Sequence, residues 1–190
     1  IMMALVMNTL MASSSSIYFP KWSGTIYEML SAPLSYLEIA LGHVFAAMTR
    51  ALVVVSIILA VSLLFVSFSI QHPFFSLGFA RLTAFSFALF GFILGLVSNS
   101  FDQLQIMPNF IVTPLSFLGG IFYSIDILPP FWQVVSLFNP FVYMINGLRY
   151  GFSGISDVSP IICLLVVGSF ALVNVLVILW IFQTGYRLRP

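Results

Sequence analysis

Few residues of this sequence could catalyse the making or breaking of a covalent bond, and their order along the chain does not fit a known catalytic arrangement. Gly151-Phe152-Ser153-Gly154 matches the GxSG pattern of intramembrane serine proteases. A serine nucleophile needs a base to take its proton, and in those proteases the histidine follows the serine. His43 and His72 both precede Ser153 here. We therefore interpret the match as accidental, and an intramembrane serine hydrolase remains an alternative without a base to support it.

The other reactive groups do not form a recognisable site either. Asp102, Asp126 and Asp157 lie at expected turns or interfaces, so no two carboxylates face each other at membrane depth. One cysteine, Cys163, and two distant histidines predict neither a metal site nor a bound cofactor. The sequence therefore predicts a chain with no catalytic residues of its own.

Nucleotide chemistry needs a lysine in a glycine-rich phosphate loop, GxxxxGK[ST]. Lys21 is the chain's one lysine, and it stands between Pro20 and Trp22. Any ATP-driven function must therefore use an ATPase in a separate subunit. The six basic residues are scattered along the chain, which also argues against a nucleic-acid partner.

Composition places the chain in a membrane. Hydrophobic residues make up 61% and charged residues 6%, against about 25% charged in soluble domains. Because a bilayer core needs about 20 apolar residues per helix, we predict an all-α membrane protein, one domain over residues 1–190. Its polytopic helical bundle has five visible spans, the first incomplete because the chain starts within a helix. These spans are Ile1–Ser16, Ala51–Ile70, Leu82–Ser98 (or from near Phe74), Leu104–Phe122 and Ile161–Phe182.

The basic residues also predict an orientation. Positive charge favours the cytoplasmic side, which puts residues 17–50 and 186–190 inside and residues 123–159 outside. Arg81 and Arg149 then lie on the outer side. Carriers and channels usually hold charges at mid-membrane, and no charge falls clearly at the midplane of these spans. A secondary carrier or channel stays an alternative with little to support it.

Residues 24–41 form an amphipathic segment on the predicted cytoplasmic side. Pro33 should break it into two short helical pieces, and its charges are Glu28 and Glu38 only. Helices that lie on a bilayer usually carry Lys and Arg, so docking to a protein is favoured over docking to lipid. The apolar positions recur at steps of three or four residues: Ile26, Leu30, Leu34, Leu37 and Leu41.

Residues 128–152 predict two short helices on the outer side. Leu128-Pro129-Pro130 begins the first, over Phe131–Phe138, and Asn139-Pro140 begins the second, over Phe141–Phe152. Both are too short to span, so we expect them to dip into the outer leaflet or to cover the mouth of the bundle. A cap without a transport role is the alternative. The charges that could pair in this region are Asp126, Arg149 and Asp157.

Three blocks of this sequence resemble ABC-2-family permeases, above all their bacterial inner-membrane members. Residues 102–124 resemble the fifth membrane helix of that family, and residues 128–132, 139–140 and 147–151 continue the pattern. Residues 24–33 are similar to its cytoplasmic coupling segment. The likeness covers nearly the whole chain. Arg81 lies in a region that the family usually keeps apolar, and nothing in the sequence accounts for it.

The resemblance implies a permease of six helices, of which this chain lacks the first. Two permease copies would join two ATP-binding cassette ATPase subunits in the inner membrane, among membrane lipid, and export drugs, lipids or glycans. Glu28, Leu30 and Pro33 would then contact the ATPase. We expect two prolines and two glycines to interrupt the fifth helix and let it bend, with close helix packing by the glycines as the alternative; these are Pro108, Pro114, Gly119 and Gly120. The outer segment would contribute Phe131, Trp132, Asn139, Pro140 and Arg149, whose aromatics suit an amphipathic cargo or interfacial anchoring.

Overall fold

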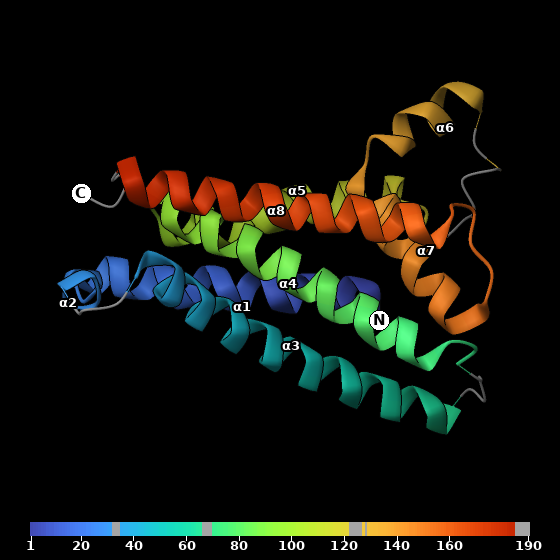
Figure 1. The fold of residues 1–190 in the computed structure, drawn as a ribbon, viewed down its shortest axis with the longest axis horizontal. Coiled ribbons are helices and arrows are strands. Elements are labelled where there is room, and N and C mark those ends of the chain that lie inside the picture. The colour runs from blue at the N-terminus through green and yellow to red at the C-terminus, as the bar shows by residue number, and fades with distance from the viewer. Residues whose placement is uncertain (32–34, 66–69, 122–126, 128, 185–190) are drawn as a thin grey trace.

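The computed structural model describes residues 1–31, 35–65, 70–121, 127 and 129–184, and these ranges form a bundle of helices (Figure 1). Most of the helices run along the long axis of the molecule, while α6 projects from one end. The elements are α1 (Met2–Ser23), α2 (Ile26–Ser31), α3 (Tyr36–Phe65), α4 (Pro73–Val97), α5 (Phe101–Leu118), α6 (Pro130–Leu137), α7 (Pro140–Ser153) and α8 (Pro160–Thr184).

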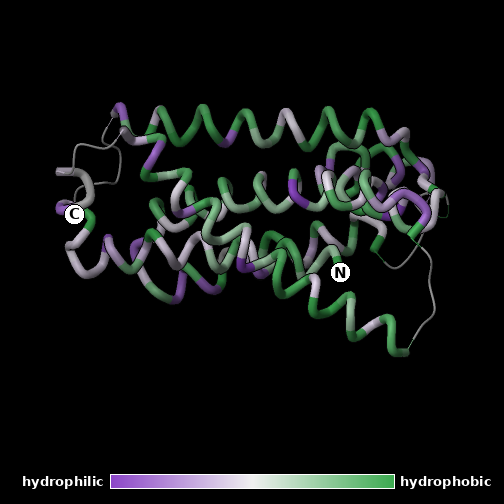
Figure 2. The backbone as a smooth tube through the Cα atoms, turned by 60° about the horizontal axis from the view of Figure 1, so that its bottom comes forward, coloured by the Kyte–Doolittle hydropathy of each residue, from purple (hydrophilic) through white to green (hydrophobic). Residues whose placement is uncertain are grey.

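Four of these helices, α1, α3, α4 and α8, are long and apolar enough to cross a membrane. Hydrophobic residues run along them, and the hydrophilic ones gather mainly toward the two ends of the bundle (Figure 2). The predicted polytopic helical bundle is confirmed. The predicted span at residues 104–122 forms as α5, which is not among the four because polar residues and two prolines lower its hydropathy. That α5 crosses the membrane stays a prediction.

Helix α1 continues to Ser23, beyond the predicted end of its span at Ser16. Its serine-rich stretch is helical, and serine hydroxyls there are satisfied by backbone carbonyls. Ser16 Oγ donates to the Ser13 carbonyl at 2.8 Å, and Ser13 Oγ donates to the Ala88 carbonyl of α4 at 2.6 Å. The helix ends where Gly24 takes a left-handed conformation, with φ of 79°.

Helix α3 corrects the prediction that residues 24–41 form two separate short pieces. The first piece is α2, but the second is the start of α3, which continues without a break to Phe65. The start is fixed by a capping box: the Ser35 backbone N–H and Oγ both donate to Glu38 Oε2 at 2.7 Å, and the Glu38 backbone N–H donates to Ser35 Oγ at 3.3 Å. Pro33 lies outside the described residues.

Glycines let α1 and α4 pack closely. A Cβ built on Gly91 would lie 2.6 Å from the Leu10 carbonyl oxygen, and one on Gly95 would meet the Ser14 carbonyl oxygen. The two glycines are four residues apart on one face of α4, which is the spacing of a GxxxG motif. The backbones of α1 and α4 therefore approach as in a tight membrane helix pair.

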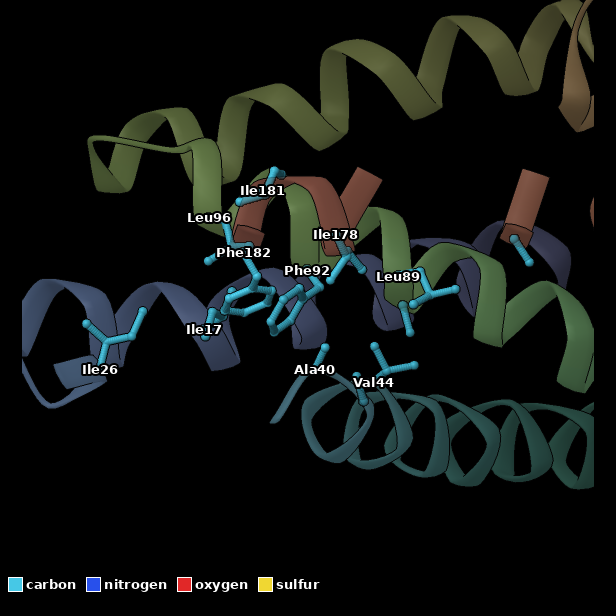
Figure 3. Close-up of a cluster of buried hydrophobic side chains, with 13 residues drawn as sticks. Ile17, Ile26, Ala40, Val44, Leu89, Phe92, Leu96, Ile178, Ile181 and Phe182 are labelled. Carbon is cyan, nitrogen blue, oxygen red and sulfur yellow. The ribbon is translucent and has the colours of Figure 1, made fainter. Parts of the chain in front are cut away.

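The core of the bundle forms where α1, α3, α4 and α8 meet (Figure 3). Ile17, Val44, Phe92 and Ile178, one from each helix, are all buried there. Tyr36 of α3 stacks on Phe182 of α8 with ring centroids 5.2 Å apart, at the same end. A second cluster fills the opposite half, around α7. Buried side chains therefore pack the bundle along its length, from the cluster around Ile17 to the cluster around α7.

Candidate functional site

The segments with predicted roles lie at opposite ends of the bundle. Helix α2 and the C-terminal end of α8 lie at one end, and α6 and α7 lie at the other (Figure 1). We call these the α2 end and the α7 end.

Helix α2 is anchored by one residue and otherwise faces outward. Ile26 is 3% exposed and belongs to the same core cluster as Ile17 of α1. Tyr27 and Glu28 are exposed, and within the described residues the Glu28 side chain forms no ion pair. The Leu30 side chain and Pro33 lie outside what the structure describes. Of the predicted coupling residues, Glu28 is therefore displayed on a short helix fixed to the core.

A lysine joins α1 to α4 at the same end. Lys21 Nζ donates to the Leu96 carbonyl at 2.6 Å and to the Ser98 carbonyl at 3.2 Å. These carbonyls lie at the C-terminus of α4, where a cation is favoured by the helix dipole and by unpaired acceptors. The sequence predicts that Lys21 is a cytoplasmic charge and no part of a phosphate loop, but it does not predict this bond. The partner is 75 residues away, so no local pattern could have revealed this contact.

Helix α5 has two very different faces. One face is a stripe at helical spacing that is buried against the bundle: Leu104, Pro108, Val112 and Ser116. The other face is exposed and carries amides beside large apolar side chains: Gln105, Ile106, Asn109, Phe110 and Phe117. Phe110 is 75% exposed. If α5 crosses the membrane as predicted, exposed polar side chains would be costly against lipid, and this face would suit a water-filled path or a protein partner better than hydrocarbon.

The glycines of α5 lie at its end and do not interrupt it. Gly119 is the C-cap, and Gly120 follows with φ of 79°. A Cβ on Gly119 would lie 3.0 Å from Phe141 Cβ and 2.9 Å from Ile145 Cδ1, both on α7. The two glycines therefore stop α5 short of the predicted end of its span, and whether they let this region bend stays a prediction. The close approach at Gly119 fits the close-packing alternative. Pro108 and Pro114 do lie inside α5.

The two short helices begin where the prolines predicted. Helices α6 and α7 start at Pro130 and Pro140, each one residue before the predicted start. Asn139 caps α7, because its Oδ1 accepts from the Phe141 backbone N–H at 3.0 Å, while its Nδ2 donates to the Leu115 carbonyl of α5 at 2.6 Å. One side chain thus both starts α7 and ties it to α5. Phe131 and Trp132 are exposed on the projecting α6.

Arg149 forms an ion pair with Asp157, two of the three charges that the sequence offered for pairing in this region. Its Nη1 lies 3.0 Å from Asp157 Oδ2, with the two side chains 28% and 14% exposed. Its Nη2 donates to the Gly120 carbonyl at 2.9 Å, and the Asp157 backbone N–H donates to Asn146 Oδ1 at 2.9 Å. Arg149 therefore joins the end of α5, α7 and the connection to α8. Asp126 lies outside the described residues.

The start of α4 is attached to the end of α7. The Gln71 and His72 backbone N–H groups donate to the Phe152 and Gly151 carbonyls at 3.2 and 3.0 Å. The His72 ring stacks on Tyr150, with centroids 4.9 Å apart. Ser153 Oγ donates to the Arg149 carbonyl of its own helix at 2.8 Å. In the described part of the chain Ser153 thus pairs with its helix backbone, and no histidine bonds to it.

Comparison with known proteins adds the family. The model of the family described as "ABC-2 type transporter" matches residues 1–153. Proteins named "Inner membrane transport permease YadH" from Escherichia coli K12, Escherichia coli O157:H7 and Shigella flexneri are each 39% identical over 189 residues. Each alignment covers 100% of this chain and 74% of the relative. No solved structure matches the chain.

Proposed function

The chain belongs to the ABC-2 type transporter family and is a multi-pass transport permease of the inner membrane, and from this premise we propose that it is the membrane-spanning subunit of an ATP-driven exporter. A separate ATP-binding cassette ATPase would bind the α2 end. Two permease copies would enclose a path along α5. Transport would open toward the α7 end.

The coupling role of α2 is supported by how it is attached. Gly24 and Thr25 alone separate α1 from α2, and Ile26 fixes α2 in the core cluster. A force on the exposed Tyr27 and Glu28 would therefore move α1 as well. Lys21, one turn before Gly24, would pass that movement to the end of α4 through the Leu96 and Ser98 carbonyls.

The single observation that carries the transport path is the exposed face of α5. Asn109 Nδ2 donates to the Gln105 carbonyl at 3.0 Å, within its own helix. Their exposed amides retain hydrogen-bonding capacity that lipid cannot satisfy. The Phe110 and Phe117 side chains beside them offer apolar surface. A face of this mixed character suits an amphipathic cargo that moves past in water.

A second copy of the chain would complete the path. At the α2 end, Phe101 of α5 packs beside Phe19 of α1, with ring centroids 6.0 Å apart and both residues about half exposed. Aromatic side chains are enriched at protein interfaces. Two copies related by a two-fold axis would bring two such patches and two α5 faces together. The amides would then face an enclosed path and not the lipid tails.

The cargo that these contacts favour is amphipathic: a lipid-like molecule, a drug or a lipid-linked glycan. The aromatics of α6 strengthen this assignment, since Phe131 and Trp132 are exposed where a substrate would leave at the α7 end. An acyl chain or a planar apolar drug could pass over them while its polar part remained in water.

Cysteine labelling tests whether α5 lines a water-filled path. Cys163 is buried, and it is replaced by serine together with any other cysteine of the full-length protein to give a cysteine-free background. In the full-length protein in membrane vesicles, Asn109→Cys should react with a sulfonated maleimide about tenfold or more faster than Leu172→Cys, because the reacting thiolate forms only where water reaches it. Leu172 on α8 is the matched control, since it is 64% exposed on an apolar span.

Equal and slow labelling at both positions would contradict the path along α5, because it would place both side chains in lipid. Equal and fast labelling would contradict it too, since the reagent would then not distinguish the two faces. The label at Asn109 should also be blocked by a bulky Phe110→Trp neighbour if the path is narrow, and an unaffected rate there would argue for open water in place of an enclosed path.

A further inference from the structure

Arg81 is a charged residue on a membrane span that the exporter proposal does not use. It lies on α4, eight residues beyond Pro73, which is about 12 Å along the helix axis. The side chain is exposed. Within the described residues it has neither a hydrogen bond nor an ion pair. Unpaired charges in spans are rare and usually functional.

Arg81 borders a shallow, wide-open depression along α3, which we call the α3–α4 groove because Arg81 supplies its α4 side. The open space above this depression is about 710 Å³. Apart from Arg81, its lining comes from α3 and is largely apolar: Met48, Thr49, Leu52, Val53, Ser56, Ile57 and Ala60. The hydroxyls of Thr49 and Ser56 donate to carbonyls of their own helix, those of Phe45 and Leu52. The groove therefore offers one cation at one side and a strip of hydrocarbon along the other.

The position of Arg81 indicates which end of a lipid it would meet. Side chains on a helix lean toward its N-terminus, and α4 begins at the α7 end, where His72 is bonded to Gly151. The long arginine side chain can therefore extend toward the headgroups on that side of the membrane. From there the α3 strip runs back toward the bilayer centre, as an acyl chain does from its headgroup.

We propose that the α3–α4 groove binds an anionic phospholipid, with the phosphate on Arg81 and an acyl chain against Leu52, Val53 and Ile57. A guanidinium binds phosphate through two parallel hydrogen bonds, and an anionic headgroup brings no ammonium to oppose it. The bound lipid neutralises a charge that hydrocarbon alone would not accept. This site is separate from the α5 face, so it stands independently of the proposed export path.

Native mass spectrometry of the full-length protein tests the site. The protein is released from nanodiscs that contain phosphatidylglycerol and phosphatidylcholine in equal amounts, and retained lipids are counted. The wild type should retain phosphatidylglycerol preferentially. Arg81→Gln should lower that retention about tenfold, the loss expected for one charge-assisted pair, and Arg81→Lys should keep most of it. Val53→Trp should also lower retention, because it fills the groove while Arg81 remains.

The matched control is Arg50→Gln, which removes an exposed arginine from α3 that does not line the groove. It should leave phosphatidylglycerol retention unchanged. Retention that does not respond to Arg81→Gln, or that responds equally to Arg50→Gln, would overturn the proposal. Equal retention of phosphatidylcholine would overturn it as well. The proposal would also be overturned if Arg81→Gln and Val53→Trp both turned a dimer into a monomer without changing the retained lipid. That result would show that a second copy of the protein occupies the groove.

Discussion

At the scale of single residues, Arg149 is informative because its two side-chain contacts join separate elements. It holds Asp157 through one nitrogen and the Gly120 carbonyl through another. The carbonyl belongs to the residue that follows the C-cap of α5, in the turn where the chain leaves the helix. A planar guanidinium can donate to both partners at once through different nitrogens. A lysine has a single ammonium nitrogen and cannot reproduce this geometry. The residue is thus a clamp between α5 and α7, independent of any cargo.

Replacing Arg149 should therefore loosen that clamp. Arg149→Ala should lower the free energy of unfolding by about 1–2 kcal/mol, the usual cost of losing hydrogen bonds to a partly exposed charged group. The measurement is equilibrium unfolding of the purified protein by SDS titration in mixed micelles. Arg50→Ala serves as the control, because Arg50 has no ion pair or side-chain hydrogen bond among the described residues. A loss of equal size in both variants would show that Arg149 contributes only its charge.

Features with a local signal could be predicted from the sequence, and contacts that depend on helix neighbours could not. Asn139-Pro140 predicted the start of α7, and the sequence named Arg149, Asp126 and Asp157 as charges that could pair without choosing between the two aspartates. The Lys21 contact with α4 and the Gly120 contact with Arg149 depend on which helices lie side by side. No spacing along the chain encodes those neighbours.

At the scale of elements, the α1–α4 pair depends on Gly91 and Gly95. Any side chain at either position would meet backbone atoms of α1. Backbone cannot move aside as a flexible side chain can, so the two helices would have to separate. The same sequence offers a glycine without this constraint, since a Cβ on Gly168 of α8 would meet nothing within 4 Å.

Gly95→Ala should lower the free energy of unfolding by about 1–3 kcal/mol, the usual cost of overpacking. Gly168→Ala should be neutral or stabilise by up to about 1 kcal/mol, because alanine favours helix over glycine. Both variants are compared by SDS titration of the purified protein. If the two variants have equal stability, α1 and α4 are not in close backbone contact.

Element boundaries show which sequence signals were missed. The prediction for α3 followed the apolar run from Ala51, but Ser35-x-x-Glu38 is a capping-box pattern that marks an earlier start. The prediction for α1 stopped at the serine-rich stretch, although serine can bond within a membrane helix. For α5, the run was extended through Gly119 and Gly120, which are common helix terminators. In each case a local hydrogen-bonding rule outweighed hydropathy.

At the scale of the whole molecule, bonded or packed contacts connect the two ends. Helix α2 is fixed to α1, α1 packs closely on α4, α4 is bonded to α7, and α7 is clamped to α5. Composition and hydropathy predicted the helical bundle. The proline and capping signals predicted the short helices α6 and α7 at one end, and the amphipathic pattern predicted α2 at the other. Which helices pack against each other could not be predicted, because one apolar helix face packs about as well on another. Small residues such as Gly91 and Gly95 favour one particular neighbour, but the sequence does not say which helix that is.

The central claim is that this permease receives its energy from a separate ATPase at the α2 end. The most direct measurement is co-purification of the full-length permease with its co-expressed ATP-binding cassette subunit in mild detergent. The wild type should retain the ATPase, and Glu28→Arg should reduce that retention about tenfold or more, since a reversed charge at an interface costs several kcal/mol. Asp102→Arg, a charge reversal near the same end, should retain it. A wild type that binds no ATPase, or a Glu28→Arg variant that binds it as well as the wild type, would contradict the account.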